Sequence, residues 1–468
     1  MPEPRLQLRL SERRLLLIGG DVLAILLSVL IALRIWAHVG RIAFDSMFIT
    51  AQAGWFVVLS GLWLLLASVN DFYDRRITAK LGGMFSRLLR IMGELLIIYL
   101  ALFFVSSRDA LPRLFILYHA ALSSVLIGVW RGCQPLLGWS AFRRRALIVG
   151  TGWAAETILD TLAQEAPHEY EIVGLIGDAQ NTVTHIGSVQ VIGTGCDLPD
   201  LVRAHHAAEL ILTYTGELPA DIFEGLITCY ELGITMIPMP LLYEQITGRV
   251  PIEHVGRQHW AVVLPLEGRS LLRQSYQVLK RLLDIVLALF GLSLFALILP
   301  IVALLMVIDS PGTIFFEQER IGRGGAPFKL IKLRSMIPDA ERESGPVWAS
   351  AHDPRVTRVG AILRKTRLDE FPQLLNVLRG DMSLVGPRPE RAVFVEQLTG
   401  QIPFYRTRLA VKPGLTGWAQ VRYRYGNTVE DALIKLQYDL YYIRHQSLLL
   451  DALIMLRTIG KMLTLQGT

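Results

Sequence analysis

Residues 364–391 read RKTRLDEFPQLLNVLRGDMSLVGPRPER, with an adjacent acidic pair, Asp369 and Glu370, among arginines and two glycine turns. A carboxylate can attack phosphorus as a nucleophile, and a neighbouring carboxylate can hold a divalent cation. Arginine side chains bind phosphate oxygens through paired hydrogen bonds. The alternative is an ordinary amphipathic helix whose acids pair with nearby basic side chains. The combination of groups favours a site that handles phosphate.

Five further blocks of sequence surround this stretch. They are DSPGTIFFEQERIG at 309–322, FKLIKLRSM at 328–336, DPRVTRVG at 353–360, VKPGLTGWAQV at 411–421 and QYDLYY at 437–442. In this order, the blocks resemble the bacterial sugar transferase family, the monotopic polyprenyl-phosphate phosphoglycosyl transferases that begin exopolysaccharide and O-antigen assembly. The resemblance covers roughly residues 273–466. Large members of the family carry a four-span bundle and a Rossmann-like domain before the catalytic part.

The composition favours a membrane protein. Hydrophobic residues make up 52% of the 468 residues and charged residues 19%, and the length indicates roughly two to four domains. The net charge of +6 does not indicate nucleic acid as a partner, because the basic residues flank apolar segments. Cys133, Cys196 and Cys229 are too far apart for a metal-ligand pattern, and we interpret them as structural thiols in a reducing compartment.

Four apolar segments are each near the ~20 residues that cross a bilayer. They lie at 15–36, 47–69, 91–107 and 114–137. Basic residues cluster before the first segment, between the second and third, and after the fourth, so both ends of the bundle face the cytoplasm. No cleavable signal is evident. We expect a multi-pass protein of the bacterial inner membrane whose chain after residue 143 is cytoplasmic.

Two acidic residues interrupt the apolar segments. Asp21 lies in the first segment and Glu94 in the third. Charged side chains inside a membrane are costly unless they are paired or functional. We expect each to pair within the bundle or to lie near a helix end, and a role in a lipid pathway is the alternative.

Residues 143–256 alternate apolar runs with polar, helix-like stretches, which predicts a parallel, doubly wound α/β domain. Gly150, Gly152 and Ala155 approximate the Rossmann-like nucleotide turn, where glycines allow close backbone approach and a helix N-terminus faces phosphate. No acidic residue follows convincingly after the next strand, although Asp178 stands near it. Nucleotide binding and a regulatory or structural role both remain open.

The segment at about 282–308 is almost wholly apolar and long enough to span a bilayer. A straight helix there would place the acidic pair on the far side of the membrane. An interior proline, Pro300, can break the helix, because it removes a hydrogen bond and clashes with the preceding turn. The resemblance implies a re-entrant helix that enters and leaves on one face. A fifth full span is the alternative.

Tyr276 and Lys280 have the spacing found in short-chain dehydrogenases and in membrane-bound nucleotide-sugar dehydratases. That pair works only over a nicotinamide in a Rossmann site. Here it lies just before the apolar segment, in an arm that looks amphipathic. We interpret the spacing as coincidence.

The resemblance implies a mechanism for the acidic pair. Asp369 attacks the β-phosphorus of a UDP-sugar and expels UMP, and undecaprenyl phosphate in the bilayer then takes the phosphosugar from the aspartate. Glu370 is the metal ligand and holds Mg²⁺. The sugar is not readable from the sequence, and glucose or galactose is a guess from the family. The expected enzyme is a polyprenyl-phosphate sugar-1-phosphate transferase.

Other residues match the family's substrate site. Arg364 and Arg388 match phosphate-binding arginines, with surface ion pairing as the alternative, and Lys332 and Arg334 add to the basic floor of the site. The nucleotide-side residues are Pro387, Gly414, Thr416 and Gln420; the alternative for the last three is a plain turn between helices. Pro372 is tolerated in the first turn of a helix, which predicts that the acidic pair lies near a helix N-terminus. Asp439 is a weaker candidate.

The predicted fold is a membrane α-helical bundle, an α/β Rossmann-like domain and a mainly α monotopic catalytic domain with a re-entrant membrane helix. The boundaries are 1–142 for the bundle, 143–256 for the Rossmann-like domain, 257–272 for a linker and 273–468 for the catalytic domain. Large family members imply a homodimer. Two other functions remain open: a non-catalytic scaffold for polysaccharide assembly and a membrane-bound nucleotide-sugar dehydratase.

Overall fold

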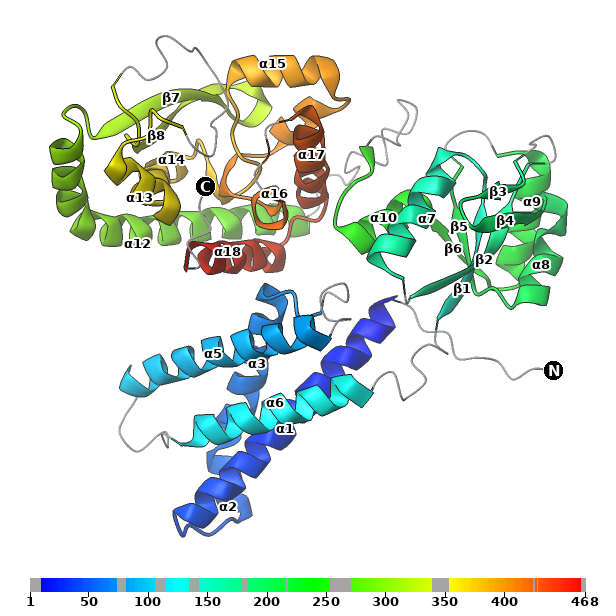
Figure 1. Ribbon diagram of the computed structural model, residues 1–468, viewed down its shortest axis with the longest axis horizontal. Coiled ribbons are helices and arrows are strands. Elements are labelled where there is room, and N and C mark those ends of the chain that lie inside the picture. Colours follow the sequence, from blue (N-terminus) through cyan, green and yellow to red (C-terminus); the bar gives the residue numbers. More distant parts are fainter. Residues whose placement is uncertain are drawn as a thin grey trace. The chain divides into compact units, whose positions relative to one another are not determined.

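The computed structural model describes residues 10–73, 81–105, 114–133, 143–167, 169–178, 183–214, 218–252, 271–338, 353–423, 426 and 428–463. The chain divides into two compact units, Met1–Leu242 and Tyr243–Thr468 (Figure 1). The first unit contains a bundle of apolar helices and an α/β domain. The second contains the acidic pair.

Four long helices form the bundle, because their apolar faces meet around a common core. Together with one short helix, they are α1 (Leu10–Val39), α2 (Ser46–Ala51), α3 (Ala53–Val69), α5 (Leu81–Val105) and α6 (Phe115–Cys133). α1 packs against α3 and α6, and α5 packs against the same two helices. Trp63, Tyr99 and Phe115 are fully buried in the core. The four predicted segments are therefore helices that pack together.

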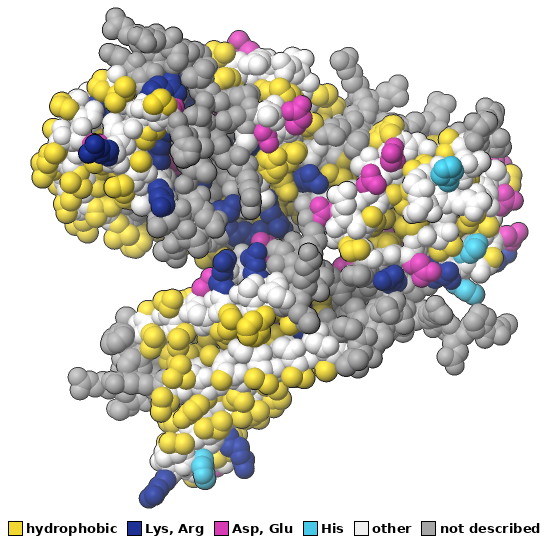
Figure 2. Space-filling model, in the orientation of Figure 1, with side chains coloured by type: hydrophobic (Ala, Val, Ile, Leu, Met, Phe, Trp, Pro, Cys, Tyr) yellow, Lys and Arg dark blue, Asp and Glu magenta, His cyan; other side chains and the backbone are white. Residues whose placement is uncertain are grey.

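The face of the bundle seen in Figure 2 is largely apolar between its ends. Leu23, Val57 and Ile97 expose 68, 75 and 68% of their surface, which suits contact with lipid. Among the described residues, three segments are long and apolar enough to cross a membrane: Leu15–Val39, Phe115–Cys133 and Arg273–Asp309. Helix α3 is apolar but shorter. Helix α5 begins ten residues before the segment predicted at 91–107, because its first turns are amphipathic rather than uniformly apolar.

The acids within the bundle are paired, as predicted. Asp21 accepts two hydrogen bonds from Arg131, Nε to Oδ1 at 3.1 Å and Nη2 to Oδ2 at 2.6 Å, and both side chains are buried. Glu94 accepts a hydrogen bond from Asn70 at 2.6 Å. These contacts join α1 to α6, and α5 to the residue that ends α3. Breaking a buried pair by removing one partner is costly, so these contacts hold the register of the helices.

The α/β domain contains a six-stranded sheet in the order β3-β4-β2-β1-β5-β6. Its elements are β1 (Arg144–Val149), α7 (Trp153–Glu165), β2 (Tyr170–Ile176), β3 (His185–Ile186), β4 (Val189–Gly193), α8 (Leu198–His205), β5 (Glu209–Leu212), α9 (Ala220–Glu231) and β6 (Thr235–Pro238). All pairs are parallel except the β3–β4 hairpin at one edge. The predicted parallel α/β domain is confirmed.

The glycine turn after β1 is packed by the protein itself. Gly150 has φ +118°, and a Cβ added there would lie 2.3 Å from the Thr213 hydroxyl oxygen and 3.3 Å from the Tyr214 ring. Gly152 caps α7, and Ala155 is fully buried in its first turn. These contacts explain the glycine pattern without a ligand. Nucleotide binding at this turn stays a prediction.

The second unit is mainly helical, with two two-stranded sheets. Its elements are α12 (Leu271–Asp309), β7 (Phe315–Ile321), β8 (Pro327–Leu333), α13 (Arg358–Thr366), η6 (Leu368–Glu370), α14 (Gln373–Arg379), β9 (Ser383–Val385), α15 (Ala392–Gln401), η7 (Tyr405–Ala410), β10 (Gly414–Thr416), α16 (Trp418–Arg422), α17 (Val429–Arg444) and α18 (Leu448–Leu463). The unit begins at Tyr243, within the range predicted for the Rossmann-like domain (143–256) and before the predicted start of the catalytic domain at 273. Val250 and Ile252 already belong to its core, and Val250 donates its N–H to the Gln437 carbonyl at 3.2 Å.

Helix α12 lies along the second unit for its whole length. Ala288, Phe295 and Met306 share one face and are buried against α14, β8 and α13. The opposite face is apolar and exposed; Leu297, for example, exposes 75% of its surface. Pro300 lies inside the helix, and the ribbon of α12 changes direction before its C-terminal end (Figure 1). Both halves of the helix therefore contact the same unit.

Tyr276 and Lys280 have a structural role. Asp451 of α18 accepts hydrogen bonds from the Tyr276 hydroxyl at 2.9 Å, from Lys280 Nζ at 2.8 Å and from the Tyr442 hydroxyl at 2.8 Å. The network ties the start of α12 to α17 and α18. It lies outside the α/β domain, as expected if the spacing is unrelated to a dehydratase.

Three glycines let two loops of the second unit touch. β9 and β10 form a short parallel pair. A Cβ on Gly414 would lie 2.1 Å from the backbone nitrogen of Gly386, and a Cβ on Gly417 would lie 2.3 Å from the Gly386 carbonyl oxygen. The close approach that Gly414 allows in this structure is to protein backbone, and its place beside a nucleotide stays a prediction.

We expect Gly414→Ala to destabilise the protein by on the order of 1–3 kcal/mol, because two backbone segments must separate to admit the methyl group. The measurement is thermal unfolding without nucleotide. Gly400→Ala is the matched control, since nothing lies within 4 Å of a Cβ added there. Equal unfolding temperatures for Gly414→Ala and the wild type would contradict this packing role.

Candidate functional site

The acidic pair lies in a tight turn between two helices. Helix α13 ends at Arg367, which has left-handed backbone angles (φ 57°), and Asp369 and Glu370 follow in the 3-10 turn η6. Pro372 is the N-cap of α14. The pair thus precedes a helix N-terminus, as the position of Pro372 predicts. Successive side chains in such a turn diverge, so the two carboxylates meet different partners.

Asp369 is 9% exposed and feels the charge of three cations, and among the described residues none of them forms a close ion pair with it. Burial and the neighbouring Glu370 carboxylate raise the pKa of Asp369 to about 6, while Lys332, Arg364 and Arg388 oppose that rise. Among the described residues, no side chain donates a hydrogen bond to the Asp369 carboxylate. A carboxylate with these surroundings is ionised at neutral pH and is more basic than an exposed aspartate, which suits a nucleophile.

Glu370 is closely paired. Arg388 donates a hydrogen bond from Nη2 to Oε1 at 2.6 Å, and Nη1 of Arg367 lies 3.7 Å from Oε2. Burial alone would raise the pKa of Glu370, but the charge and hydrogen bond of Arg388 outweigh it and hold the pKa below its ordinary value. Glu370 therefore stays ionised.

Lys332 extends from β8 toward the acidic pair. Its ammonium lies 5.5 Å from the centre of the Phe316 ring. Burial and the nearby Arg320 guanidinium lower the pKa of Lys332 to about 8, although Asp369 favours its charged form. The Lys332 amine therefore loses its charge at a pH only slightly above neutral.

The two other predicted basic residues have different neighbours. Arg364 in the last turn of α13 donates Nε to the Ser335 hydroxyl at 2.9 Å, and its charge acts on Asp369. Arg334 instead donates to the Ser310 carbonyl at 2.5 Å and the Pro311 carbonyl at 3.1 Å, just after α12. The structure brings Arg364 to the acidic pair and gives Arg334 a role in fixing the end of α12.

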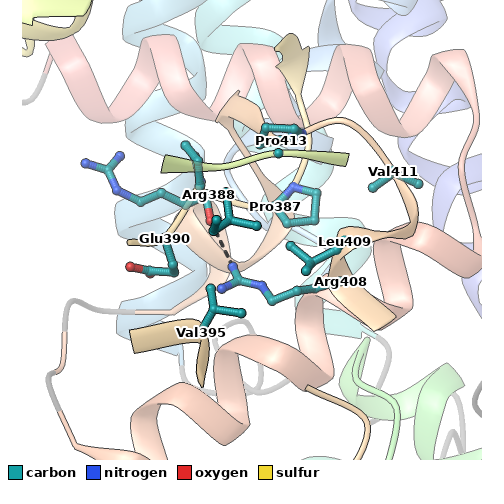
Figure 3. A pocket seen from close by; sticks show the side chains of 11 residues that line it. Pro387, Arg388, Glu390, Val395, Arg408, Leu409, Val411 and Pro413 are labelled. Atoms are coloured by element: carbon teal, nitrogen blue, oxygen red, sulfur yellow. Dashed lines mark hydrogen bonds between the residues drawn. The ribbon is translucent and has the colours of Figure 1, made fainter. Parts of the chain in front are cut away.

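The loop that carries Arg388 is held by its carbonyl groups, because Pro387 and Pro389 have no N–H. Pro387 accepts from the Gly414 N–H at 2.9 Å, Arg388 from Arg408 Nη2 at 3.0 Å and Pro389 from Arg320 Nη1 at 3.2 Å. Behind this loop is a small pocket lined by Pro387, Arg408 and neighbouring apolar side chains (Figure 3). The Arg388 side chain points away from the other labelled lining residues (Figure 3).

Two of the predicted nucleotide contacts point into the protein. The Thr416 hydroxyl shares a hydrogen bond of 2.6 Å with the Thr458 hydroxyl of α18 and is buried. Gln420 donates to the Leu415 carbonyl at 3.2 Å. These contacts stabilise the loop from β10 to α16. Of the nucleotide-side residues, Pro387 alone directly precedes a residue that touches the acidic pair.

Two residues near the site were not anticipated from the sequence. Ser335 contacts Arg364, and Arg408 holds the Arg388 carbonyl. These contacts join positions far apart in the chain, and no local pattern reveals them. Arg367 contacts Glu370, as the alternative of a helix with paired acids allows, and Asp439, the weaker candidate, binds Arg408 behind the Arg388 loop.

The carboxylates suit a metal that arrives with its substrate. No cluster of three His, Cys, Asp or Glu side chains that could hold a metal occurs among the residues that the structure describes. Mg²⁺ is commonly held by one or two carboxylates together with substrate phosphates. Glu370 provides one such carboxylate once it releases Arg388.

Two family models match the chain. Residues 275–465 match the model described as bacterial sugar transferase, and residues 68–224 match one described as CoA-binding domain. The first match contains all the residues that surround the acidic pair.

Curated relatives extend this match. The UDP-glucose:undecaprenyl-phosphate glucose-1-phosphate transferase of Escherichia coli is 31% identical over 406 residues, which are 85% of this chain and 85% of the relative. A Caulobacter vibrioides protein of the same description is 48% identical over 201 residues, 42% of this chain and 74% of the relative. The UDP-N-acetylgalactosamine-undecaprenyl-phosphate N-acetylgalactosaminephosphotransferase of Aeromonas hydrophila is 39% identical over 268 residues, 57% of this chain and 62% of the relative. The chain therefore belongs to the bacterial sugar transferase family and is a transferase enzyme.

Proposed function

We propose that this enzyme transfers a sugar-1-phosphate from a UDP-sugar to undecaprenyl phosphate and releases UMP. The observation that carries the proposal is the environment of Asp369, a buried carboxylate with a raised pKa that faces Lys332, Arg364 and Arg388. The names of the relatives support the two substrates. The reaction would be the first membrane step of exopolysaccharide or O-antigen synthesis.

In the first step, a carboxylate oxygen of Asp369 attacks the phosphorus that carries the sugar. The bond from this phosphorus to the oxygen of UMP breaks, and UMP leaves with the electron pair. The phosphosugar remains joined to Asp369 as an acyl phosphate, a mixed anhydride. Lys332, Arg364 and Arg388 stabilise the negative charge of the phosphate oxygens during the displacement.

In the second step, a phosphate oxygen of undecaprenyl phosphate attacks the same phosphorus. The bond to Asp369 breaks, the carboxylate is regenerated, and undecaprenyl diphosphate sugar is released. Two displacements at one carboxylate predict ping-pong kinetics.

Glu370 would hold Mg²⁺ together with the diphosphate. The ion would supply charge neutralisation on the leaving phosphate. Arg388 would then move from Glu370 to a phosphate oxygen, since Mg²⁺ and the Arg388 guanidinium both bind the Glu370 carboxylate.

Two other functions have less support. A non-catalytic scaffold has no need to keep Asp369 buried among cations. A dehydratase would need Tyr276 and Lys280 beside a nicotinamide, whereas both bind Asp451. The transferred sugar stays open, because relatives are named for glucose, galactose and N-acetylgalactosamine donors.

We further propose that α12 is re-entrant and that the acidic pair works on the cytoplasmic side of the inner membrane. The proposal is supported by Pro300 inside the helix and by the contacts of both halves of α12 with one unit. The exposed apolar face would contact lipid. A homodimer stays a prediction.

The direct test is intact-mass spectrometry of the purified protein after incubation with Mg²⁺ and a panel of UDP-sugars without lipid. We expect an added phosphosugar on the wild type and none on Asp369→Asn, whose turnover should fall on the order of 10⁴-fold or more. Asp200→Asn is the matched control, since the Asp200 side chain is 88% exposed on the α/β domain. Near-normal turnover by Asp369→Asn would exclude this mechanism.

The rate of transfer should depend on pH in a bell shape. Asp369 must be ionised to attack, so the rate rises with pH through its pKa of about 6. Lys332 must be charged to stabilise phosphate, so the rate falls as pH rises through its pKa of about 8. Lys332→Arg keeps its charge and should lose the alkaline limb in steady-state rates. An unchanged alkaline limb in this variant would assign that limb to another group.

Labelling of single cysteines in intact cells tests the re-entrant helix. We expect Glu317→Cys, in a background without the three native cysteines, to be protected from a membrane-impermeant maleimide, because β7 would stay on the cytoplasmic side. Met47→Cys is the control for periplasmic access; Met47, at the start of the second predicted span, is 80% exposed in α2. Labelling of Glu317→Cys to the level of Met47→Cys would establish a fifth span.

A further inference from the structure

A buried arginine lies directly behind the loop that carries Arg388. Arg408 of η7 is 7% exposed. Its Nη1 donates to the Tyr405 hydroxyl at 2.8 Å, and its Nη2 donates to the Arg388 carbonyl at 3.0 Å. Figure 3 shows the second contact as a dashed line between the Arg408 guanidinium and the Arg388 backbone.

Asp439 fixes the charge and the orientation of Arg408. Its Oδ2 accepts from Nε at 3.1 Å and from Nη2 at 2.8 Å, and Asp439 is 2% exposed on α17. A planar guanidinium with carboxylate, hydroxyl and carbonyl partners has little freedom to rotate. The carbonyl of Arg388 therefore has a fixed donor.

The two prolines explain why this donor matters. Proline locks its own φ and restricts the residue before it, so Pro387 and Pro389 leave the Arg388 backbone few conformations. The direction of the Arg388 carbonyl is the backbone feature that the prolines leave free. That direction also determines where the side chain leaves the backbone.

We propose that Arg408 is a positioning residue for Arg388. By holding the Arg388 carbonyl, it aims the Arg388 guanidinium at Glu370, 2.6 Å away in this structure, and at the substrate phosphate during transfer. Arg408 itself touches neither reacting group. The inference rests on the proposed function, because only that function gives Arg388 a phosphate to bind.

Arg408→Lys keeps the charge beside Asp439 but removes the fork. A lysine ammonium is a point charge and cannot reach the carboxylate, the Tyr405 hydroxyl and the Arg388 carbonyl in the same geometry. We expect kcat/KM for the UDP-sugar to fall roughly 10- to 100-fold, as small misplacements of a catalytic group do. Arg406→Lys, two residues away at an exposed position, is the matched control and should transfer at the wild-type rate.

The decisive experiment is a double-mutant cycle with Arg388→Ala. If Arg408 acts through Arg388, then Arg408→Lys should change kcat/KM by less than about threefold once Arg388 is alanine. A general structural role would give the same loss in both backgrounds, and that result would overturn the proposal. Thermal unfolding of each variant is measured alongside. If Arg408→Lys does not fold, Asp439→Asn takes its place in the cycle, because it releases Arg408 at nearly constant volume.

The cycle also separates this inference from the proposed function. A wild type that forms no phosphosugar adduct and transfers no sugar phosphate would remove the proposed function, and this inference with it. A fully active Arg388→Ala would overturn the positioning role while leaving the transfer reaction intact.

Discussion

A charge that is buried needs a partner, and this requirement organises much of the enzyme. Arg408 pairs with Asp439 in the second unit, Arg144 with Glu209 in the α/β domain, and Asp21 with Arg131 in the bundle. The acidic pair applies the rule unequally. Glu370 has a guanidinium at 2.6 Å, whereas the described cations around Asp369 act on it from farther away. The poorly compensated carboxylate is the one with the basicity that a nucleophile needs.

Much of the fold could be predicted because periodicity and hydropathy determine it. The apolar helices, the parallel sheet and the turn with left-handed Gly150 follow from patterns within short windows of sequence. The predicted limits of the helices were less accurate than the prediction that the helices exist. The start of α5 was missed, since an amphipathic turn is invisible to a count of apolar residues.

The site could be predicted in part. The motif around Asp369 placed Glu370, Arg364, Lys332 and Arg388 correctly near one another. It did not reveal that Arg334 binds the carbonyls that follow α12, because local sequence does not show which carbonyls an arginine after a strand will reach. It did not reveal the backbone contact of Gly414, because a glycine required by a backbone contact and one required by a ligand look the same in sequence.

The early start of the second unit bears on where a catalytic fragment of this enzyme should begin. The family match begins at residue 275, yet Val250 and Ile252 belong to the core of the second unit. The Gly248 carbonyl also accepts a hydrogen bond from the Trp418 indole at 3.1 Å. Glu244 adds an ion pair with Arg444. A fragment trimmed to the matched residues would lose these contacts. Each apolar side chain that is removed takes away roughly 1.5–3 kcal/mol of burial free energy. A fragment that keeps the whole of this core would therefore begin near Tyr243, some thirty residues before the family match does.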